Sequence, residues 1–519
     1  MAKPLESGTV SAPGFYGLNT QDSSVGLEDG FATVANNAVI DKYGRIGSRK
    51  GWTIVNTAGA AIGANDVKAI HEHFGPTGTQ YILVAASTKL YKLASGTLTE
   101  LTYGGGGSAP TITDSNWEIV SLNGIAYFFQ LGHDPLYFDP ATSTTVYKRV
   151  TEHGSYSATI PSANIAISAY GRLWVAGTST NKVTVSWSDQ LLGYVWGTGT
   201  SGSLNLTTVF TNGMDEIVGI EAINGLLVIF CKKCIIIYEN AMTPSASTFI
   251  LREVIKNVGC LARDSIQNTG NDILFLSATG VQSLSRLQQN DTALPLKDVS
   301  RNVRDDLLEY VTGTTDKNTI KSVYHPYEAL YVLSFPASDT SYVFDTRAVL
   351  ENGASRATTW ALAPTAFCST SDNTLLMGMT SYVGLYTGST DNTASFRLQY
   401  FTNYKDLKLP TIIKILKRIG FTIKGPSGQA VVIKWGFDYN VSYKSISKTL
   451  DATGSAAYFN IAEFNEAISE YNGGDVLTRI RVPASGSGLV LQLGIETDIS
   501  ESQVSIQAMD IYIKQGKQI

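Results

Sequence analysis

Residues 224–239 read NGLLVIFCKKCIIIYE, two short apolar runs separated by Lys232 and Lys233. The runs are rich in aliphatic, β-branched and aromatic residues, which favour strands, and the lysine pair marks a two-residue turn. Neither run alternates between apolar and polar residues, so both faces of each strand are expected to be buried between neighbouring sheets. This stretch therefore predicts a hairpin from the interior of a large β-protein.

The same pattern of an apolar strand, a short polar turn and a second aromatic-rich strand occurs seven times along the chain. The copies occupy residues 79–93, 123–139, 170–189, 224–239, 271–287, 327–345 and 372–388. Equivalent apolar positions, from Tyr81 to Leu375, are 45, 47, 53, 47, 57 and 45 residues apart. Each unit can hold four short strands, so the period predicts a β-propeller of six or seven blades. Hairpins in sandwich folds are the alternative, because irregular spacing also occurs there.

The repeat divides the chain into three regions of an expected all-β fold. Residues 66–390 contain the period and are expected to form the propeller. Residues 391–519 contain strand patterns without the period, which predicts a C-terminal β-sandwich-like domain. Residues 1–65 are rich in glycine and polar residues, which predicts an extended, turn-rich N-terminal arm. Apolar residues at helical spacing predict two short helices, in residues 298–311 and 460–473.

Composition narrows the class of protein. The chain has 519 residues, of which 16% are charged and 43% hydrophobic, with 48 glycines and 26 tyrosines, and this excludes a disordered chain or a long coiled coil. Its 39 basic and 44 acidic residues give a net charge of −5, which argues against a protein that grips DNA phosphates. We expect synthesis in a cytoplasm and no membrane span, because the N-terminus lacks an apolar signal segment and no run of 18 apolar residues occurs. Four cysteines are too few for a disulfide framework.

Two motifs could carry chemistry, and both are weak. Cys231 and Cys234 form a CxxC, but no second CxxC completes a zinc site and no helix is expected after it, as in a redox motif. His71 and His73 alternate on an expected strand, which places both imidazoles on one face. A third ligand is not visible, so surface histidines are the preferred interpretation. We therefore expect no enzymatic activity, no catalytic residue, no cofactor and no metal site.

One segment is locally basic. Between residues 397 and 424 the sequence has seven positive residues against the single Asp406. Apolar residues alternate with some of these cationic residues, so the solvent-exposed face of a strand could present the positive charges to DNA phosphates or to an acidic partner. A solvated edge strand protected by lysines is the alternative. The candidates for contact with DNA or an acidic partner are Lys405, Lys408, Lys414, Lys417 and Arg418.

Three stretches carry a resemblance to a known family. They are APGFYGLNTQDSSVGLEDGFATVANNAVIDKYGRIGSRKGW (12–52), GRLWVAGTSTNKVTVSWSD (171–189) and DEIVGIEAINGLLVIFCKKCIIIYE (215–239). Together with the repeat, they resemble the tail nozzle proteins of short-tailed bacteriophages, also called tail tubular protein B. The resemblance spans most of residues 12–390, and residues 391–519 depart from it. In the first stretch, an Asn-Asn region and an Arg-Gly strand look like the family's N-terminal arm: Asn36, Asn37, Arg45, Arg49 and Gly51.

This resemblance implies a structural virion protein of the tail, made in the host cytoplasm. It implies a ring of six copies, attached to the adaptor protein below the portal, that retains the packaged genome. The ring would conduct double-stranded DNA through its lumen without sequence recognition during ejection. Tail fibre or tailspike proteins and needle or gate proteins are further expected partners. We expect subunit contacts from aromatic and cationic residues of the arm: Tyr16, Phe31, Arg45, Arg49 and Trp52.

Two other classes stay open. A propeller enzyme acting on cell-surface polysaccharide, a glycoside hydrolase or lyase, would use the many aromatic residues for sugar stacking. It would need carboxylates that converge at the axial mouth of the propeller. A monomeric interaction propeller of the WD-repeat or kelch type is disfavoured, because the repeats lack the Gly-His and Trp-Asp signatures and the paired glycines.

Overall fold

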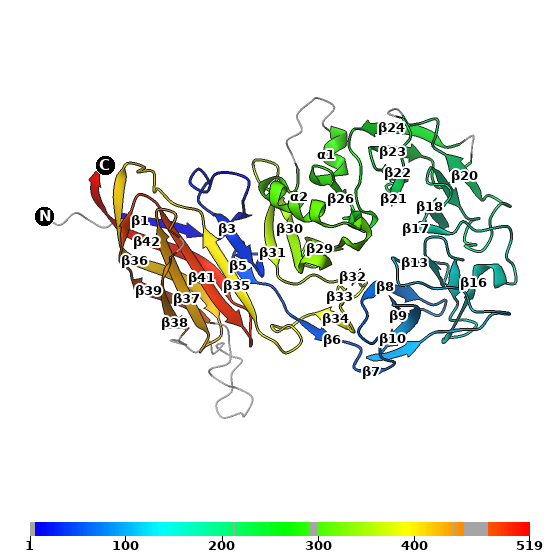
Figure 1. The fold of residues 1–519 in the computed structure, drawn as a ribbon, viewed down its shortest axis with the longest axis horizontal. Helices are drawn as coiled ribbons and strands as arrows, with labels where there is room; N and C mark the ends of the chain where they lie inside the picture. The colour runs from blue at the N-terminus through cyan, green and yellow to red at the C-terminus, as the bar shows by residue number, and fades with distance from the viewer. Residues whose placement is uncertain are drawn as a thin grey trace, which may run out of the picture.

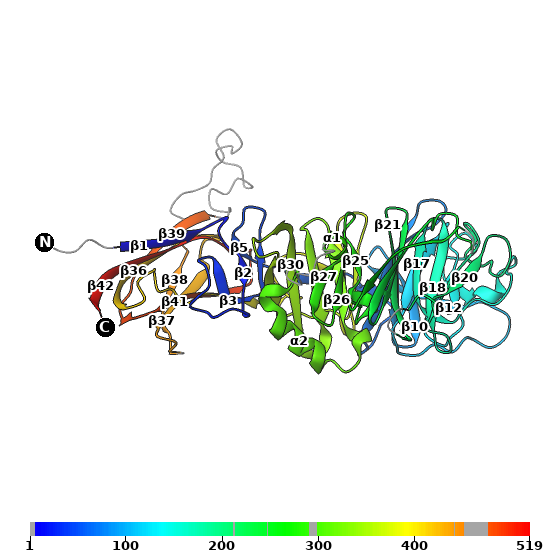
Figure 2. The same cartoon turned by 90° about the horizontal axis from the view of Figure 1, so that it is seen from above.

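The structure is a computed structural model that describes residues 6–210, 213–245, 248–289, 298–440, 442–450 and 476–518. The described chain is mostly strand, as the sequence predicts. A β-propeller occupies one end of the molecule and a β-sandwich the other (Figure 1). Seen from above, the two parts lie end to end along the longest axis (Figure 2).

The propeller consists of six blades and one smaller sheet in the described residues. The first four blades are antiparallel and follow the chain order. Their strands are β8 (Val67–Phe74), β9 (Gln80–Ala86), β10 (Lys89–Ala94) and β11 (Thr97–Glu100); β13 (Glu118–Leu122), β14 (Ile125–Phe129), β15 (Leu136–Phe138) and β16 (Val146–Arg149); β17 (Ala163–Ala169), β18 (Arg172–Thr178), β19 (Thr184–Trp187) and β20 (Gly202–Asn205); and β21 (Ile217–Ile223), β22 (Leu226–Cys231), β23 (Cys234–Glu239) and β24 (Ile250–Lys256). Two short strands, β7 (Ala58–Gly59) and β12 (Thr102–Tyr103), extend the first two blades.

The remaining sheets complete the ring. A three-stranded sheet precedes two further blades. Their strands are β25 (Gln267–Asn268), β26 (Ile273–Ser277) and β27 (Gly280–Ser283); β28 (Lys321–His325), β29 (Leu330–Phe335), β30 (Thr340–Val349) and β31 (Ser355–Trp360); and β32 (Ala366–Ser369), β33 (Leu375–Gly378), β34 (Val383–Tyr386) and β6 (Trp52–Ile54). Every sequence repeat supplies the second and third strands of one sheet, which confirms the predicted β-propeller. These strands are the most apolar because both of their faces are covered by neighbouring sheets.

The ring is closed by a strand from the other end of the chain. Strand β6 is the outermost strand of the last blade and pairs with β34 in antiparallel orientation. Just before it, the Gly51 amide donates to the Gly388 carbonyl at 3.1 Å. A Cβ at Gly51 would lie 2.0 Å from the Thr390 carbonyl oxygen, so only glycine allows the two segments to approach this closely.

Helices cover one side of the propeller near the three-stranded sheet (Figure 1). The helix predicted in residues 298–311 is confirmed as a 3-10 turn, Arg301–Val303, that continues into α2 (Arg304–Gly313). Its buried Val303, Leu307 and Val311 form the expected apolar stripe. A second helix, α1 (Leu284–Gln289), ends the repeat at residues 271–287, where the sequence pattern predicts strand. The helix predicted in residues 460–473 lies outside the described residues.

The sandwich is formed by two sheets whose strands come from both ends of the chain. One sheet contains β1 (Glu6–Ser11), β4 (Ala38–Ile40), β5 (Ile46–Ser48), β36 (Ile412–Gly425), β39 (Val476–Pro483), β40 (Ser487–Gly488) and β42 (Ser505–Gln518). The other contains β2 (Gly17–Leu18), β3 (Phe31–Asn36), β35 (Phe396–Thr402), β37 (Ala430–Phe437), β38 (Lys444–Thr449) and β41 (Leu491–Ile499). The region predicted as an extended arm thus supplies five sandwich strands, and one of them, β1, pairs with β42 about 500 positions later.

The sandwich and the propeller share one sheet. Strands run in the order β28-β29-β30-β31-β2-β3-β35-β41-β37-β38, so a propeller blade continues into the sandwich without a break. The largest hydrophobic cluster also crosses the boundary, from Leu307 and Tyr331 in the propeller to Ile433 and Ile511 in the sandwich. Continuous backbone pairing and a common core indicate that the two parts move as one body.

Candidate functional site at the propeller axis

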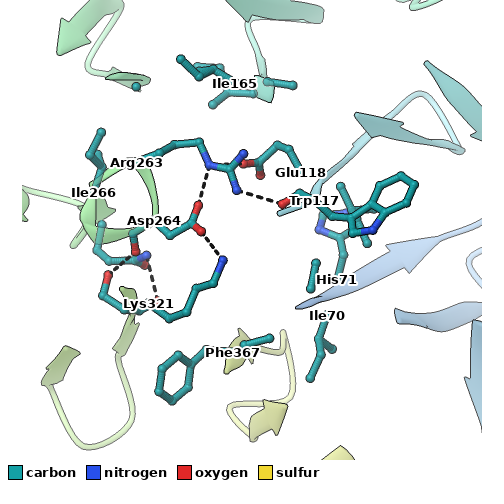
Figure 3. A pocket seen from close by; sticks show the side chains of 18 of the residues that line it. Ile70, His71, Trp117, Glu118, Ile165, Arg263, Asp264, Ile266, Lys321 and Phe367 are labelled. Atoms are coloured by element: carbon teal, nitrogen blue, oxygen red, sulfur yellow. Dashed lines mark hydrogen bonds and ion pairs between the residues drawn. The ribbon is translucent and has the colours of Figure 1, made fainter. Parts of the chain in front are cut away.

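A cavity of about 230 Å³ lies where the first strands of the sheets meet (Figure 3). It is lined by residues of β8, β13, β17, β21, β25, β28 and β32 and of the 3-10 turn Arg263–Ser265. Titratable side chains from these elements gather in it: Lys68, His71, Glu118, Glu221, Arg263, Asp264 and Lys321. We call Glu118, Arg263, Asp264 and Lys321 the axial cluster.

Arg263 is at the centre of the axial cluster. Its Nε donates to Asp264 Oδ1 at 2.5 Å and lies 3.2 Å from a Glu118 carboxylate oxygen. Its Nη2 donates to the Trp117 carbonyl oxygen at 2.8 Å, and its Nη1 donates to the Asn164 carbonyl oxygen. One buried guanidinium therefore joins the segment before β25 to the second and third blades (Figure 3).

Asp264 continues the cluster to the opposite side of the axis. Lys321 Nζ, from β28, donates to Asp264 Oδ2 and to Asn116 Oδ1. Ser322 Oγ donates to the Asp264 carbonyl oxygen at 2.7 Å. Burial alone would raise the pKa of Asp264, but the charges of Arg263 and Lys321 outweigh it and hold that pKa well below its usual range. Asp264 is thus a permanent anion between two cations.

Glu118 behaves in the opposite way. Burial raises the pKa of its carboxyl to about 7, and the neighbouring Arg263 only partly offsets this rise. Burial also raises the pKa of Glu221, whose Oε1 accepts a hydrogen bond from the Ala222 amide at 3.0 Å. The axial cluster therefore holds one carboxylate that is always charged, Asp264, and one that exchanges its proton near neutral pH, Glu118. The axial cluster can therefore hold and release a proton, and its hydrogen bonds and ion pairs join four of the sheets.

A pH-dependent contribution to stability follows from Glu118. The carboxyl has an unfolded pKa of 4.5 and a folded pKa of about 7, so the folded state binds the extra proton between these values. Its stabilising contribution is complete below pH 4.5 and is lost as the pH rises through 7. We expect Glu118→Gln to become more stable relative to the wild type by about 1–2 kcal/mol between pH 5 and 8, a value reduced for partial exposure.

Urea unfolding of both proteins at the two pH values measures this difference. The side chain of Glu118 is 27% exposed, so a matched exposed variant, Glu100→Gln, controls for the loss of a surface carboxylate. A difference between Glu118→Gln and wild type that stays constant with pH would show that Glu118 titrates normally.

His71 and His73, which alternate on strand β8, line the gap between the first two blades. His71 Nε2 and His73 Nδ1 each lie 2.8 Å from the Ser121 hydroxyl of β13. Both rings share one face of β8, as predicted, but they are not surface residues, since His73 is fully buried and His71 lines the axial cavity. Burial lowers both pKa values to about 4, with a further contribution to His71 from His73. The neutral imidazoles thus connect neighbouring blades.

Three of the predicted subunit contacts are corrected by the structure. Phe31, Arg49 and Trp52 are buried against this chain's own core, so their side chains are unavailable to a neighbouring subunit. Tyr16 is half-buried, with its ring centroid 5.2 Å from that of Phe31. Arg45 lies 4.5 Å over the ring of Tyr43 and remains partly exposed. Tyr16 and Arg45 are the two that another subunit could reach.

Arg49 instead joins the sandwich to the propeller. It lies between β5 and β6, and its Nη1 and Nη2 donate to the two carboxylate oxygens of Asp391 at 2.7 and 2.6 Å. Nε donates to Asn37 Oδ1 at 2.9 Å, and the guanidinium lies 4.0 Å from the centroid of the Phe396 ring. Asp391 belongs to the segment that returns from the last blade to the sandwich. We call Asn37, Arg49, Asp391 and Phe396 the junction cluster.

The basic segment separates into buried and exposed residues. Lys405 is buried with its Nζ bonded to Asp29, and Lys414 is buried with its Nζ donating to the Leu489 carbonyl oxygen at 2.7 Å, so both are corrected as surface candidates. Lys408, Lys417 and Arg418 are exposed. A register shift at Leu416/Arg418 breaks the alternation of β36, as a bulge does.

β36 pairs on both sides, so the alternative of a protected edge strand is wrong. The three exposed cations remain candidates for contact with DNA or an acidic partner.

The axial cluster itself is not predicted by the sequence analysis. One signal was available: Lys68, Glu118, Glu221 and Lys321 each lie in the strand directly before a repeat. Because these first strands face the axis in a propeller, charged residues at those positions indicate a polar axis. Arg263 and Asp264 have no such regular position, since they form a 3-10 turn.

No helix in the described part of the chain is long and apolar enough to cross a membrane. No family model matches the chain, and no curated protein matches it. Solved structures do resemble it, at low identity. One is described as the extracellular domain of a one-component system from B. thetaiotaomicron (12% identity, TM-score 0.40), with 82% of this chain and 59% of that chain covered. Another is the WD40 domain of Neurospora crassa Pan2 (10% identity, TM-score 0.39), with 66% and 98% covered.

Proposed function

We propose that this chain is a structural subunit of a phage tail nozzle, which forms a ring that retains the genome and conducts DNA during ejection. The observation that carries the proposal is the unbroken sheet from propeller to sandwich, with a common core beneath it. A ring under internal pressure needs subunits that do not bend between domains. The residues that resemble the family's arm, Asn37 and Arg49, hold this junction together.

The axial cavity supports a DNA path between subunits rather than through one propeller. At about 230 Å³, and with Arg263, Asp264 and Lys321 bonded across it, the axis of a single chain has no room for a duplex. The lumen would therefore lie at the symmetry axis of the ring. Such a ring closes through heterologous interfaces, in which different surfaces of each copy meet.

Mass photometry of the purified full chain, alone and with an adaptor ring from a short-tailed phage, tests the proposal. We expect a closed species near six times 55.8 kDa, either spontaneously or on the adaptor. Negative-stain imaging of that species should show a central channel. A protein that stays monomeric and does not bind the adaptor ring under any condition would contradict the proposal.

A polysaccharide-active enzyme is the second candidate, and one observation favours it. Glu118 and Asp264 share the axial cavity with pKa values shifted in opposite directions, as in an acid and its charged partner. Against it, both carboxylates are already bonded within the chain, and the cavity is smaller than the roughly 300 Å³ at which ligand pockets begin. Reducing-sugar release from capsular polysaccharide that is lost in Glu118→Gln would favour the enzyme.

A further inference from the structure

Three potential metal ligands meet at the turn between β22 and β23. Cys231 ends β22 and Cys234 begins β23, so the two thiols flank the turn Lys232–Lys233. Pairing of Phe230 with Ile235 places Cys231 opposite Cys234. Asp215, from the segment that enters β21, completes the group, and the three ligand atoms all lie within 4.8 Å of one another. The sequence shows no second CxxC, and Asp215, which lies 16 residues before Cys231, belongs to no metal-binding pattern with it.

The carboxylate is fixed in place by the backbone. Asp215 Oδ1 accepts a hydrogen bond from the Glu216 amide at 2.8 Å, and Oδ2 accepts one from the Lys233 amide at 2.9 Å. Cys234 Sγ lies 3.5 Å from Asp215 Oδ2. Only about 6% of Asp215 is exposed, and both cysteines are buried, so the donors are oriented before any ligand arrives.

A buried carboxylate beside two thiols is unusual for packing alone. Both cysteines belong to the apolar core between the third and fourth blades. A carboxylate in that position costs free energy unless its charge is matched. Lys232, in the adjacent turn, does not match it, because its Nζ bonds to Glu216 Oε2 at 2.7 Å. Two thiolates and a carboxylate form a donor set that a dication would neutralise to a net charge of −1.

We propose that Asp215, Cys231 and Cys234 bind one thiophilic divalent cation of the zinc class. Sulfur donors select zinc, cadmium or cobalt over magnesium or calcium, which prefer oxygen. The three side chains supply three vertices of a tetrahedron, and a water molecule from the exposed turn supplies the fourth. Binding releases the two thiol protons to solvent, and the cation's charge replaces them, so no oxidant is needed.

The bound cation fastens the connection between two blades. Asp215 lies in the segment that leads from β20 of the third blade to β21 of the fourth. The cysteines lie on the β22–β23 hairpin of the fourth blade. A cation between them would join this connecting segment to the hairpin, and it would therefore stabilise the folded state by mass action. This role is independent of the proposed nozzle function.

Cobalt(II) titration of the reduced full chain tests the site. We expect a thiolate-to-cobalt charge-transfer band that saturates at one equivalent per chain and is displaced by zinc. Cys234→Ser and Asp215→Asn should each weaken binding by at least the ~10-fold that changes around a metal site commonly cost. Cys260→Ser is the matched control, since Cys260 is a buried thiol outside the group and should leave the titration unchanged.

A second readout keeps the test independent of folding in the variants. Zinc should slow alkylation of Cys231 and Cys234 in the unaltered protein and leave Cys368 unaffected, as measured by mass spectrometry of peptides. Absence of a thiolate band at excess cobalt would overturn the proposal. Equal cobalt affinity in wild type and Cys234→Ser would overturn it as well.

Discussion

Replacing Arg263 by alanine is expected to destabilise the protein by about 3–5 kcal/mol, the usual cost of removing one partner from a buried ion pair. The substitution leaves the Asp264 carboxylate with Lys321 as its remaining partner and removes the donor to Glu118. It also removes the donors to two carbonyl oxygens, of Trp117 and Asn164, that belong to different blades. The loss is therefore expected to exceed that of an ordinary surface arginine severalfold.

Chemical denaturation of wild type, Arg263→Ala and Arg263→Lys measures this effect. The lysine variant keeps the charge but cannot reach all four acceptors, so we expect an intermediate loss. Arg252→Ala is the matched control, because Arg252 is half-exposed, pairs with Glu239 at 3.3 Å and should cost under about 1 kcal/mol. If Arg263→Ala and Arg252→Ala unfold at the same denaturant concentration, the axial cluster does not hold the sheets together.

The propeller is readable from the sequence because its hairpins are local. A strand such as β22 finds its partner β23 within a few residues, and an apolar run with a polar turn is enough to specify that pairing. Helix α1 is not predicted from the sequence, because its six residues include only two apolar ones, Leu284 and Leu287, and are too few to show a helical period.

The rest of the structure depends on contacts that no local pattern contains. Strand β1 pairs with β42, so Glu6 lies opposite Ile513, and glycine-rich composition alone predicted an arm instead. The axial cluster needs several sheets to converge before Arg263 and Lys321 meet Asp264. Likewise, Lys414 looked like a surface cation in an alternating strand, but pairing on both sides and backbone acceptors nearby allow it to be buried.

Arg49→Ala is expected to have a comparable effect, also about 3–5 kcal/mol, at the boundary between sandwich and propeller. Arg49 is the only described side chain that bonds bidentately to Asp391, and it also donates to Asn37, whose side chain in turn donates to the Arg397 carbonyl oxygen at 2.8 Å. Both segments that cross between the two parts therefore lose a shared partner, and the partly buried Asp391 carboxylate loses its counter-ion.

Calorimetry of Arg49→Ala should then show a thermal unfolding transition that differs from wild type in its shape and has a lower midpoint temperature. With the junction cluster broken, the sandwich and the propeller are expected to unfold in two resolved transitions, whereas wild type should unfold more cooperatively because the shared sheet and core couple the two parts. Arg45→Ala, four residues earlier and partly exposed, should retain the wild-type profile.

A double variant, Arg49→Met with Asp391→Leu, should recover part of the stability lost in Arg49→Ala, because removing both charges leaves neither one without its partner. If the double variant loses as much as the sum of the single changes, the two side chains act independently and the junction is held by the sheet alone.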